Sequence, residues 1–312
     1  MRIIVTGGCG FLGAHLCSAL LDDGAHVICM DDLSTGRLKN VAILSGHPRF
    51  TFVKHDVSEP FNFPVEQIYN LACIASPLHY MRDPIKTMRT SVYGAMNVSV
   101  LAEKENATVL QASTSEIYGD SLIQPLCENN LGNVDCLSSR ACYQEGKRAA
   151  EALLKDFSKT RNVNVKIVRI FNTYGPRMAL NDGRLISNLL VQSIKGKDLT
   201  IYGDGKQTRS FCFVDDLIDG LILLMNSSSQ GPINLGNPEE LSVLRIAELI
   251  RSKAKTKIDL KFLDKLEDDP LRRKPAIELA QKELNWSPKI SFDDGLEITR
   301  KYFKNALKST KN

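Results

Sequence analysis

The sequence has little net charge, no long apolar run and no segment that resembles a leader. Its 40 basic residues exceed its 36 acidic residues only slightly, which disfavours nucleic acid as a partner and suits a small anionic substrate. The longest apolar stretch, residues 217–225, contains Asp219 and is too short to cross a bilayer. The chain begins with the strand-like "MRIIVTGG" instead of a secretion signal. We therefore expect a cytoplasmic protein without a membrane or nucleic-acid partner.

The cysteines also lack a recognisable spacing. All eight are scattered along the chain, and no two form a CxxC pair. Several fall within apolar helix or strand patterns, so buried, reduced thiols are expected rather than disulfides or metal ligands. The sequence predicts no metal site and contains no internal repeat.

The chain alternates short apolar strands with amphipathic helices. "RIIVTGG" is followed by a helical pattern that ends on Gly24, and "HVICMDD" supplies the next strand. Further strands are expected at "FTFVKHDV", "QIYNLAC", "TVLQAST" and "VKIVRIFN", with helices near 84–105 and 143–161. The alternation predicts an α/β fold with a doubly wound parallel sheet of the Rossmann type. We assign residues 1–172 to this domain and 173–312 mainly to a smaller C-terminal substrate-binding lobe, with some later segments returning to the sheet.

The turn after the first strand is rich in glycine. Gly7, Gly10 and Gly13 fit the dinucleotide-binding template G-x-x-G-x-x-G. Gly8, Gly10 and Gly13 fit the related template G-x-G-x-x-G. Glycine lets the backbone approach a pyrophosphate, whose charge then lies at the N-terminus of the following helix. A plain strand–helix turn is the alternative, but Asp31 ends the next strand at the spacing of a ribose-binding acid. No arginine directly follows Asp31, so NAD is favoured over NADP.

A second motif combines a tyrosine with a lysine. Tyr143 and Lys147 lie one turn apart on one face of a predicted helix. A nearby ammonium favours the phenolate and lowers the tyrosine pKa from about 10, so that the residue can act as a base. A solvated helix surface is the alternative. The "TSE" that begins at Thr114 follows a predicted strand, at the edge of the sheet where ligands bind in such folds.

These motifs resemble a known superfamily. The glycine turn, "STSEIYGD" and "CYQEGKR" are similar to the extended short-chain dehydrogenases/reductases, whose members modify nucleotide sugars. A closer resemblance, to the UDP-glucuronate decarboxylases or UDP-xylose synthases, covers residues 1–305 and rests on "NLACIASPLHYMRDPIKT", "RIFNTYGPRMALNDGRLISN", "IYGDGKQTRSF", "NLGNPEE" and "DDPLRRKPAI". Dehydratases of the dTDP-glucose type have Asp-Glu where this chain has Ser115-Glu116. UDP-galactose 4-epimerases lack the glutamate, and GDP-mannose dehydratases lack the "RKP" string.

The resemblance implies NAD-dependent conversion of UDP-glucuronate to UDP-xylose. In that family NAD⁺ takes a hydride from C4 while a tyrosinate takes the O4 proton, the β-keto acid loses CO₂, and the hydride returns. By analogy Tyr143 is the base, Lys147 lowers its pKa and binds the nicotinamide ribose, and Thr114 positions the sugar. Ser115, Glu116 and Arg273 would support CO₂ loss or proton delivery.

The resemblance also implies ligand contacts along the whole chain and a homodimer formed through the helices near 84–105 and 143–161. Cofactor contacts are expected from Gly7, Gly10, Phe11, Leu12, Gly13, Asp31, Asp32, Thr35, Gly36, Asp56, Val57, Leu71, Thr90, Tyr143 and Lys147. Contacts with UDP-glucuronate are expected from Ala75, Tyr80, Arg89, Arg140, Asn172, Arg184, Tyr202, Arg209 and Arg273.

Some positions depart from the family pattern. Arg89 and Ser91 replace a usual Lys and Asn, Gln144 replaces a common Asp, and Ala276 replaces the Asp of "RKPD". The loop "NVDCLSSRACY" also differs from the usual lead-in to the tyrosine. These changes bear on substrate preference more than on reaction type.

Three alternatives to the proposed reaction stay open: a decarboxylase that releases UDP-4-keto-pentose, another nucleotide-sugar epimerase or dehydratase, and a non-catalytic protein that binds NAD and a UDP-sugar. The complete catalytic set disfavours the last.

Overall fold

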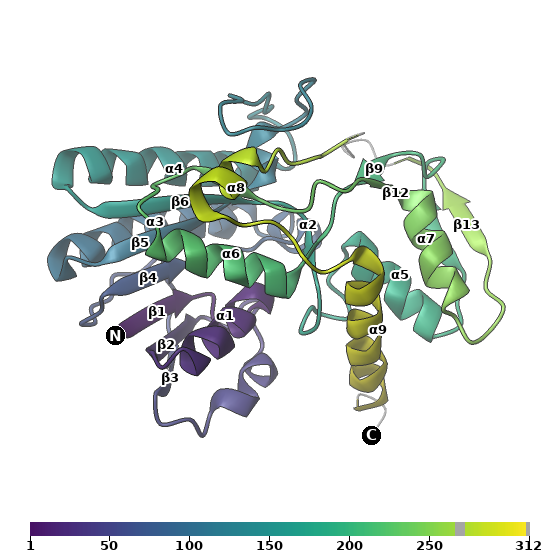
Figure 1. Ribbon diagram of the computed structural model, residues 1–312, viewed down its shortest axis with the longest axis horizontal. Coiled ribbons are helices and arrows are strands. Elements are labelled where there is room, and N and C mark those ends of the chain that lie inside the picture. Colours follow the sequence, from purple (N-terminus) through teal and green to yellow (C-terminus); the bar gives the residue numbers. More distant parts are fainter. Residues whose placement is uncertain (266–271, 310–312) are drawn as a thin grey trace.

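The computed structural model describes residues 1–265 and 272–309, and its largest element is a seven-stranded parallel sheet in the order β11-β6-β5-β4-β1-β2-β3 (Figure 1). The doubly wound α/β fold predicted from the sequence is confirmed. The strands are β1 (Arg2–Thr6), β2 (His26–Asp31), β3 (Phe50–Lys54), β4 (Gln67–Asn70), β5 (Thr108–Thr114), β6 (Asn164–Ile170) and β11 (Ile233–Leu235). The first four residues of the string at 268–277 lie outside the described residues.

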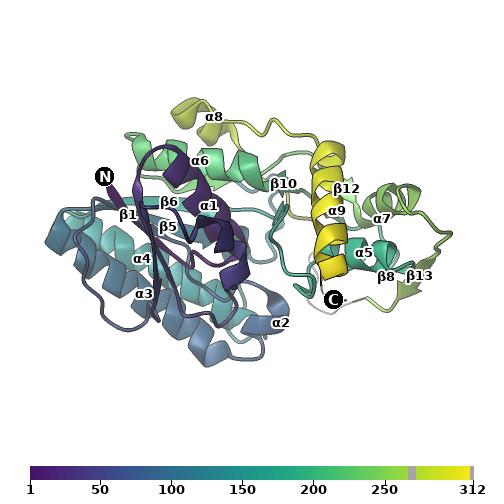
Figure 2. The same cartoon turned by 90° about the horizontal axis from the view of Figure 1, so that it is seen from below.

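Helices cover both faces of the sheet, so its central strands are apolar on both sides. Ile3, Ile4 and Val5 of β1 are fully buried, as expected for a parallel strand between two helical layers. Figure 2 shows α3 (Pro84–Glu105) and α4 (Ala141–Arg161) on one face. The other face holds α1 (Phe11–Asp22), α6 (Val214–Asn226) and α8 (Glu278–Leu284).

Two later segments belong to this sheet layer although they follow residue 172. β11 pairs in parallel with β6, and α6 packs on α1. The two long helices on the opposite face each end at an asparagine whose backbone is in the left-handed conformation. Asn106 ends α3 and Asn162 ends α4. The sheet therefore recruits chain from both halves of the sequence.

A smaller lobe lies beside the sheet, on the side away from the N-terminus (Figure 1). Its helices are α5 (Leu185–Ile194), α7 (Val243–Ser252) and α9 (Phe292–Ser309). Its strand pairs are β8 (Leu199–Tyr202) with β13 (Leu260–Leu263) and β9 (Thr208–Arg209) with β12 (Leu241–Ser242). The short pair of β7 (Thr173–Tyr174) and β10 (Cys212–Phe213) joins the segment before α5 to the segment after β9.

The remaining short elements are α2 (Pro77–Tyr80) and the 3₁₀ turns η1 (Leu38–Asn40), η2 (Ala42–Leu44) and η3 (Ser115–Tyr118). Among the described residues, no helix has both the length and the apolar character needed to cross a bilayer. Of the eight cysteines, all free thiols, four are buried and Cys136 is exposed.

Candidate active site

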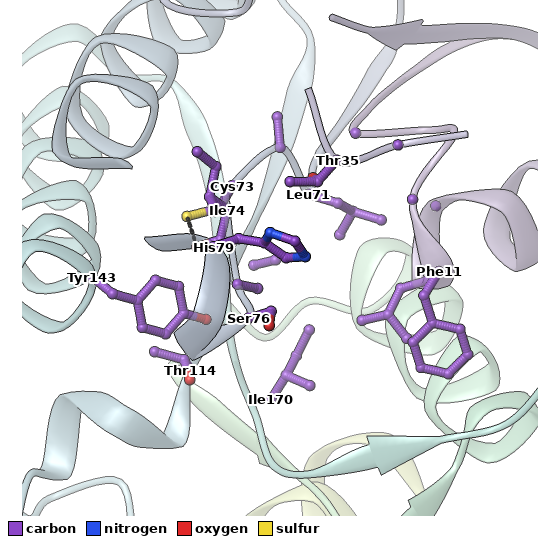
Figure 3. A pocket seen from close by; sticks show the side chains of 18 of the residues that line it. Phe11, Thr35, Leu71, Cys73, Ile74, Ser76, His79, Thr114, Tyr143 and Ile170 are labelled. Atoms are coloured by element: carbon purple, nitrogen blue, oxygen red, sulfur yellow. Dashed lines mark hydrogen bonds between the residues drawn. The ribbon is translucent and has the colours of Figure 1, made fainter. Parts of the chain in front are cut away.

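One cavity of about 360 Å³ runs from the glycine turn to the smaller lobe, a size typical of small-molecule sites. It lies at the carboxyl ends of the sheet strands, where ligands bind in open α/β sheets. Figure 3 shows Tyr143 and Thr114 close together, with Thr35 and Phe11 on the opposite side of the view. The predicted residues that line the cavity are Gly7, Gly10, Phe11, Leu12, Gly13, Asp31, Asp32, Thr35, Gly36, Asp56, Val57, Leu71, Ala75, Thr90, Thr114, Ser115, Glu116, Arg140, Tyr143, Lys147, Asn172, Arg184, Arg209 and Arg273.

Three predicted ligand contacts do not line the cavity. Tyr80 is fully buried and stacks on Tyr143 instead. Arg89 forms an ion pair with Glu59 at the surface, with a 3.4 Å distance between Nη2 and Oε1. Tyr202 ends an outer strand of the smaller lobe and is 40% exposed.

The glycine turn has the close packing that a dinucleotide site requires. Gly7 has a left-handed φ of +69°, and its carbonyl oxygen accepts from the Gly10 amide at 3.0 Å. A Cβ on Gly13 would lie 2.2 Å from the Gly7 carbonyl oxygen, so a side chain would push the turn apart. Helix α1 starts directly after Gly10, and no side chain caps it. Its N-terminus is therefore open to an anion.

Asp31 ends β2 and organises the loop that follows. Its two oxygens accept from the amides of Cys9 and Leu33, at 2.9 and 2.8 Å. Burial raises the pKa of Asp31, although these two amides oppose the shift. A Cβ at Gly36 would lie 2.5 Å from the carboxylate, so glycine lets the loop pass close to the acid. The arrangement leaves a carboxylate beside the glycine turn, where a ribose hydroxyl fits.

The neighbouring Asp32 is paired with a lysine that sequence reasoning missed. Lys86 Nζ, from the first turn of α3, lies 2.6 Å from Asp32 Oδ2 and 3.9 Å from Asp56 Oδ2. The hydrogen bond to Asp32 raises the pKa of Lys86. Lys86 belongs to the string "DPIKT", but nothing in that string indicates which carboxylates the ammonium contacts.

The "TSE" stretch forms a tight turn at the end of β5. Thr114 is the last residue of the strand, and its hydroxyl accepts from the Glu116 amide at 3.2 Å, which caps η3. Thr114 and Ser115 are both buried. The strand end and the cap together turn Glu116 toward the cavity.

Tyr143 and Lys147 lie on one face of α4, as predicted. The sequence predicted that Lys147 lowers the pKa of Tyr143, and for the chain without a bound ligand this prediction is wrong. Burial raises that pKa, and the neighbouring Cys73 and Glu116 raise it further, while a hydrogen bond with Thr114 opposes them. The Lys147 ammonium instead donates to the Ala112 carbonyl oxygen at 2.7 Å. The lysine is thus fixed by the backbone of β5.

Glu116 and Arg273 meet in the cavity near Tyr143. Arg273 Nη1 lies 3.7 Å from Glu116 Oε1, and both side chains are largely buried. The other carboxylate oxygen of Glu116 is buried and has no hydrogen-bond partner among the described residues. A buried carboxylate with one unsatisfied oxygen beside a guanidinium is suited to bind a polar group of a ligand.

A second guanidinium lies close to the same groups. Arg184 binds both carboxylate oxygens of Asp182, one of them at 2.9 Å. Burial alone would lower the pKa of Arg184, but Asp182 and the nearby Tyr143 and Glu116 raise it. Sequence reasoning missed Asp182, although it precedes Arg184 by two residues in "NDGR".

The cavity also contains residues without a local sequence signal. Arg37 donates to the Arg177 carbonyl oxygen at 2.8 Å, which joins the loop after Gly36 to the loop after β7. Cys73 lines the wall beside Tyr143, and its thiol lies 3.3 Å from the Ser91 hydroxyl. Ser91 is one of the departures from the family pattern. Of the others, Gln144 is buried in α4, and the Ala276 carbonyl oxygen accepts from Asn234 at 3.2 Å.

Comparisons with known proteins agree with this geometry. The sequence model of the "NAD dependent epimerase/dehydratase family" matches residues 3–236. "UDP-glucuronic acid decarboxylase 1" of Arabidopsis thaliana is 48% identical over 307 residues, which is 98% of this chain and 71% of that protein. The protein of the same name from Xenopus tropicalis is 46% identical over 311 residues, 100% of this chain and 74% of its own length.

Among solved structures, a variant of UDP-glucuronic acid 4-epimerase from Bacillus cereus superposes with a TM-score of 0.88 at 28% identity. The match covers 98% of this chain and 100% of that one, which was crystallised with UDP-4-deoxy-4-fluoro-glucuronic acid and NAD. The UDP-glucose 4-epimerase of Thermotoga maritima, at 24% identity and a TM-score of 0.88, supports the fold alone.

Proposed function

Because the chain belongs to the NAD dependent epimerase/dehydratase family, and within it to the UDP-glucuronic acid decarboxylases, we propose that it converts UDP-glucuronate to UDP-xylose and CO₂. The overall reaction takes up one proton, because a carboxylate leaves as neutral CO₂ and C5 gains a hydrogen. The observation that carries the proposal is the buried pair of Glu116 and Arg273 in the same cavity as Tyr143.

The cofactor is NAD, and the chain's own residues fit it. The glycine turn leaves room for the pyrophosphate, and the uncapped N-terminus of α1 favours its charge. Asp31 accepts hydrogen bonds from the ribose hydroxyls and repels a 2′-phosphate. Lys147 would hold the nicotinamide ribose. When bound there, NAD would supply a hydride acceptor, and then a hydride donor, for C4 of the sugar.

The oxidation half of the reaction needs a base at O4. Tyr143 acts as this base in its phenolate form: its Oη takes the O4 proton and becomes the phenol, and Thr114, the hydrogen-bond partner of that oxygen, positions the same hydroxyl. When the C4 ketone is reduced again, Tyr143 returns the proton to O4. The raised pKa of the phenol favours this return, because the protonated form is the stable one in the buried site.

The decarboxylation half needs orientation and charge control. A 4-keto sugar with a carboxylate on C5 is a β-keto acid, so electrons from the breaking C–C bond pass into the ketone as an enolate. Arg273 and Arg184 hold the leaving carboxylate against Glu116, and the desolvated environment favours neutral CO₂ over the carboxylate. Glu116, with Ser115 beside it, then supports proton delivery to C5.

The smaller lobe is proposed to hold the UDP half of the substrate. Arg209 and Asn172 line the cavity next to the lobe, and arginine suits a diphosphate. Arg140 lies at the start of α4 and also lines the cavity. Tyr80, Arg89 and Tyr202 need a ligand-induced movement or another role, since none of the three lines the cavity in this structure.

We further propose a cytoplasmic homodimer. The outer face of α3 leaves several large apolar side chains partly exposed. They are Ile85, Tyr93, Met96 and Val100, at 75%, 51%, 38% and 52% exposure. A row of this kind on one long helix is typical of a helix that packs against another subunit.

The proposed function is tested by incubating purified protein with UDP-glucuronate and NAD⁺ and following the sugars by NMR and the reduced cofactor by absorbance. UDP-xylose without accumulation of reduced cofactor is the expected result. UDP-4-keto-pentose with reduced cofactor would identify an enzyme that releases its intermediate. UDP-galacturonate would identify a 4-epimerase, and no conversion despite bound NAD would contradict the proposed activity.

A further inference from the structure

A buried ion pair connects β6 to α4, the helix that bears Tyr143 and Lys147. Arg169 on β6 binds Glu151 on α4 through two contacts, Nη2 to Oε2 at 2.8 Å and Nε to Oε1 at 3.1 Å. The side chains are only 10% and 13% exposed. Glu151 Oε1 also accepts from the hydroxyl of Ser113 at 2.5 Å. Ser113 directly precedes Thr114, so this pair fastens α4 to the end of β5.

The same arginine reaches the turn that holds Glu116. Arg169 Nη1 donates to the Tyr118 hydroxyl at 3.0 Å, and its guanidinium lies over the Tyr118 ring at 5.1 Å. The Tyr118 hydroxyl donates in turn to Asn234 Oδ1 at 2.8 Å. Burial raises the pKa of Tyr118 to about 12, so the hydroxyl keeps the proton that it donates. Tyr118 is the last residue of η3, two positions after Glu116.

Asn234 connects this turn to the segment of Arg273. Its Nδ2 donates to the carbonyl oxygens of Leu126 and Ala276, at 2.9 and 3.2 Å. Leu126 binds the same segment on both sides, because its amide donates to the Lys274 carbonyl oxygen at 2.8 Å and its carbonyl oxygen accepts from the Ala276 amide at 2.9 Å. The segment directly after Arg273 is therefore tied to the network through Asn234 and Leu126.

The contact between Glu116 and Arg273 is weaker than the hydrogen bonds of this network. Their closest atoms are 3.7 Å apart, beyond hydrogen-bond distance, and one oxygen of Glu116 has no partner among the described residues. η3 is a single short 3₁₀ turn, which has little stability of its own. The distance between the two side chains must therefore be set by what holds their backbones.

We propose that the chain of contacts Arg169–Tyr118–Asn234 positions Glu116 against Arg273 and thereby controls decarboxylation separately from oxidation at C4. None of the three side chains is among the cavity-lining residues of the described chain, so they are positioning residues and not catalytic ones. The inference rests on the proposed function, because it assigns Glu116 and Arg273 to CO₂ loss and Tyr143 to oxidation.

The test compares Tyr118→Phe with Tyr69→Phe. The first substitution removes the hydroxyl that joins Arg169 to Asn234, while the Tyr69 hydroxyl is equally buried but has no partner among the described residues. Single-turnover reactions with carboxyl-labelled UDP-glucuronate separate CO₂ release from formation of the reduced cofactor. Tyr118→Phe removes both hydrogen bonds of that hydroxyl and is expected to slow CO₂ release about tenfold or more and to leave oxidation unchanged. Tyr69→Phe is expected to change neither rate.

A second measurement separates positioning from general loosening of the fold. In a Glu116→Gln background, Tyr118→Phe is expected to cause no further loss of CO₂ release, because the group that it positions is already altered. Equal slowing of both steps by Tyr118→Phe, or the same loss in both backgrounds, would overturn the inference. If Tyr118→Phe does not fold, Asn234→Leu, which breaks the same route at its other end without altering a contact of α4, is subject to the same expectations and the same two contrary results. A wild-type protein that releases no CO₂ would instead contradict the proposed function.

Discussion

The rings of Tyr80 and Tyr143 stack face to face, with centroids 5.1 Å apart and planes 3° apart. Tyr80 is fully buried, and its hydroxyl has no partner among the described residues. The orientation of the Tyr143 ring is therefore set by packing as well as by the hydrogen bond with Thr114. Removal of the Tyr143 hydroxyl should leave that ring in place.

Tyr143→Phe should remove the base for O4 without unfolding the site. We expect kcat to fall by about 10²–10⁴-fold, the usual contribution of a positioned acid–base group. NAD affinity and melting temperature should stay close to those of the wild type, because the stack persists. UDP-xylose formation, cofactor titration and thermal unfolding measure the three quantities. Tyr93→Phe, at an exposed site on α3, is the matched control, and a Tyr143→Phe enzyme with most of its activity would contradict the assignment.

Glu116→Gln should separate the two halves of the reaction. The substitution keeps the size of the side chain and removes the charge that faces Arg273. We expect CO₂ release to slow by about 10²–10³-fold, with a measurable residual rate, while oxidation at C4 continues, so that reduced cofactor accumulates in a single turnover. Labelled CO₂ and absorbance follow the two halves. Glu59→Gln alters a surface ion pair instead and serves as the control. Full retention of CO₂ release in Glu116→Gln would exclude the role.

Gly13→Ala should weaken cofactor binding. The new methyl group would lie 2.2 Å from the Gly7 carbonyl oxygen and 2.7 Å from the Gly8 Cα, both backbone atoms of the turn. Overpacking of this kind typically costs about 1–3 kcal/mol, so the affinity for NAD should fall about tenfold or more. Calorimetric titration measures it. Gly46→Ala is the control, because a Cβ there meets nothing within 4 Å. Unchanged affinity in Gly13→Ala would show that the turn does not contact the cofactor.

The folded protein should lose stability at alkaline pH. Burial raises the pKa of Tyr118 to about 12 and shifts the pKa values of Tyr69, Tyr80 and Tyr174 upward as well. In the unfolded chain these phenols ionise near pH ~10, so above that pH the unfolded state loses protons that the folded state keeps. Their contribution to stability is thus fully present below about pH 10 and is lost as the pH rises toward about 12.

Urea unfolding at a series of pH values measures this loss, and Tyr69→Phe should make the decline less steep. Tyr93→Phe, at an exposed position, should leave the profile unchanged. A denaturation midpoint that stays constant through pH ~11 would contradict the prediction.

Val100→Glu should disrupt the proposed homodimer. The substitution places a charge in the apolar row on α3, where burial in an interface would leave it unpaired. We expect light scattering to report a dimer for the wild type and a monomer for the variant at the same concentration. Leu223→Glu, at a 43% exposed position on α6, should leave the dimer intact. A wild-type protein that is monomeric would contradict the proposed homodimer.

The sequence by itself determined the features that depend on neighbouring residues. The glycine turn, the acid at the end of β2, and the spacing of Tyr143 and Lys147 each follow from local geometry, because a strand end and one helical turn place nearby side chains predictably. The alternation of apolar strands with amphipathic helices predicted a parallel sheet for the same reason. Each of these features could be predicted from a window of a few tens of residues.

Only the tertiary structure decided which side chains meet across the chain. Lys147 binds the Ala112 carbonyl oxygen and not the phenol, Lys86 pairs with Asp32, and Glu116 meets Arg273 from the far end of the sequence. It also left Arg89 at the surface and stacked Tyr80 on Tyr143. Such contacts depend on the rotation of each helix about its axis and on the closure of long loops. Neither is encoded in local periodicity, because both are settled by the packing of the whole core.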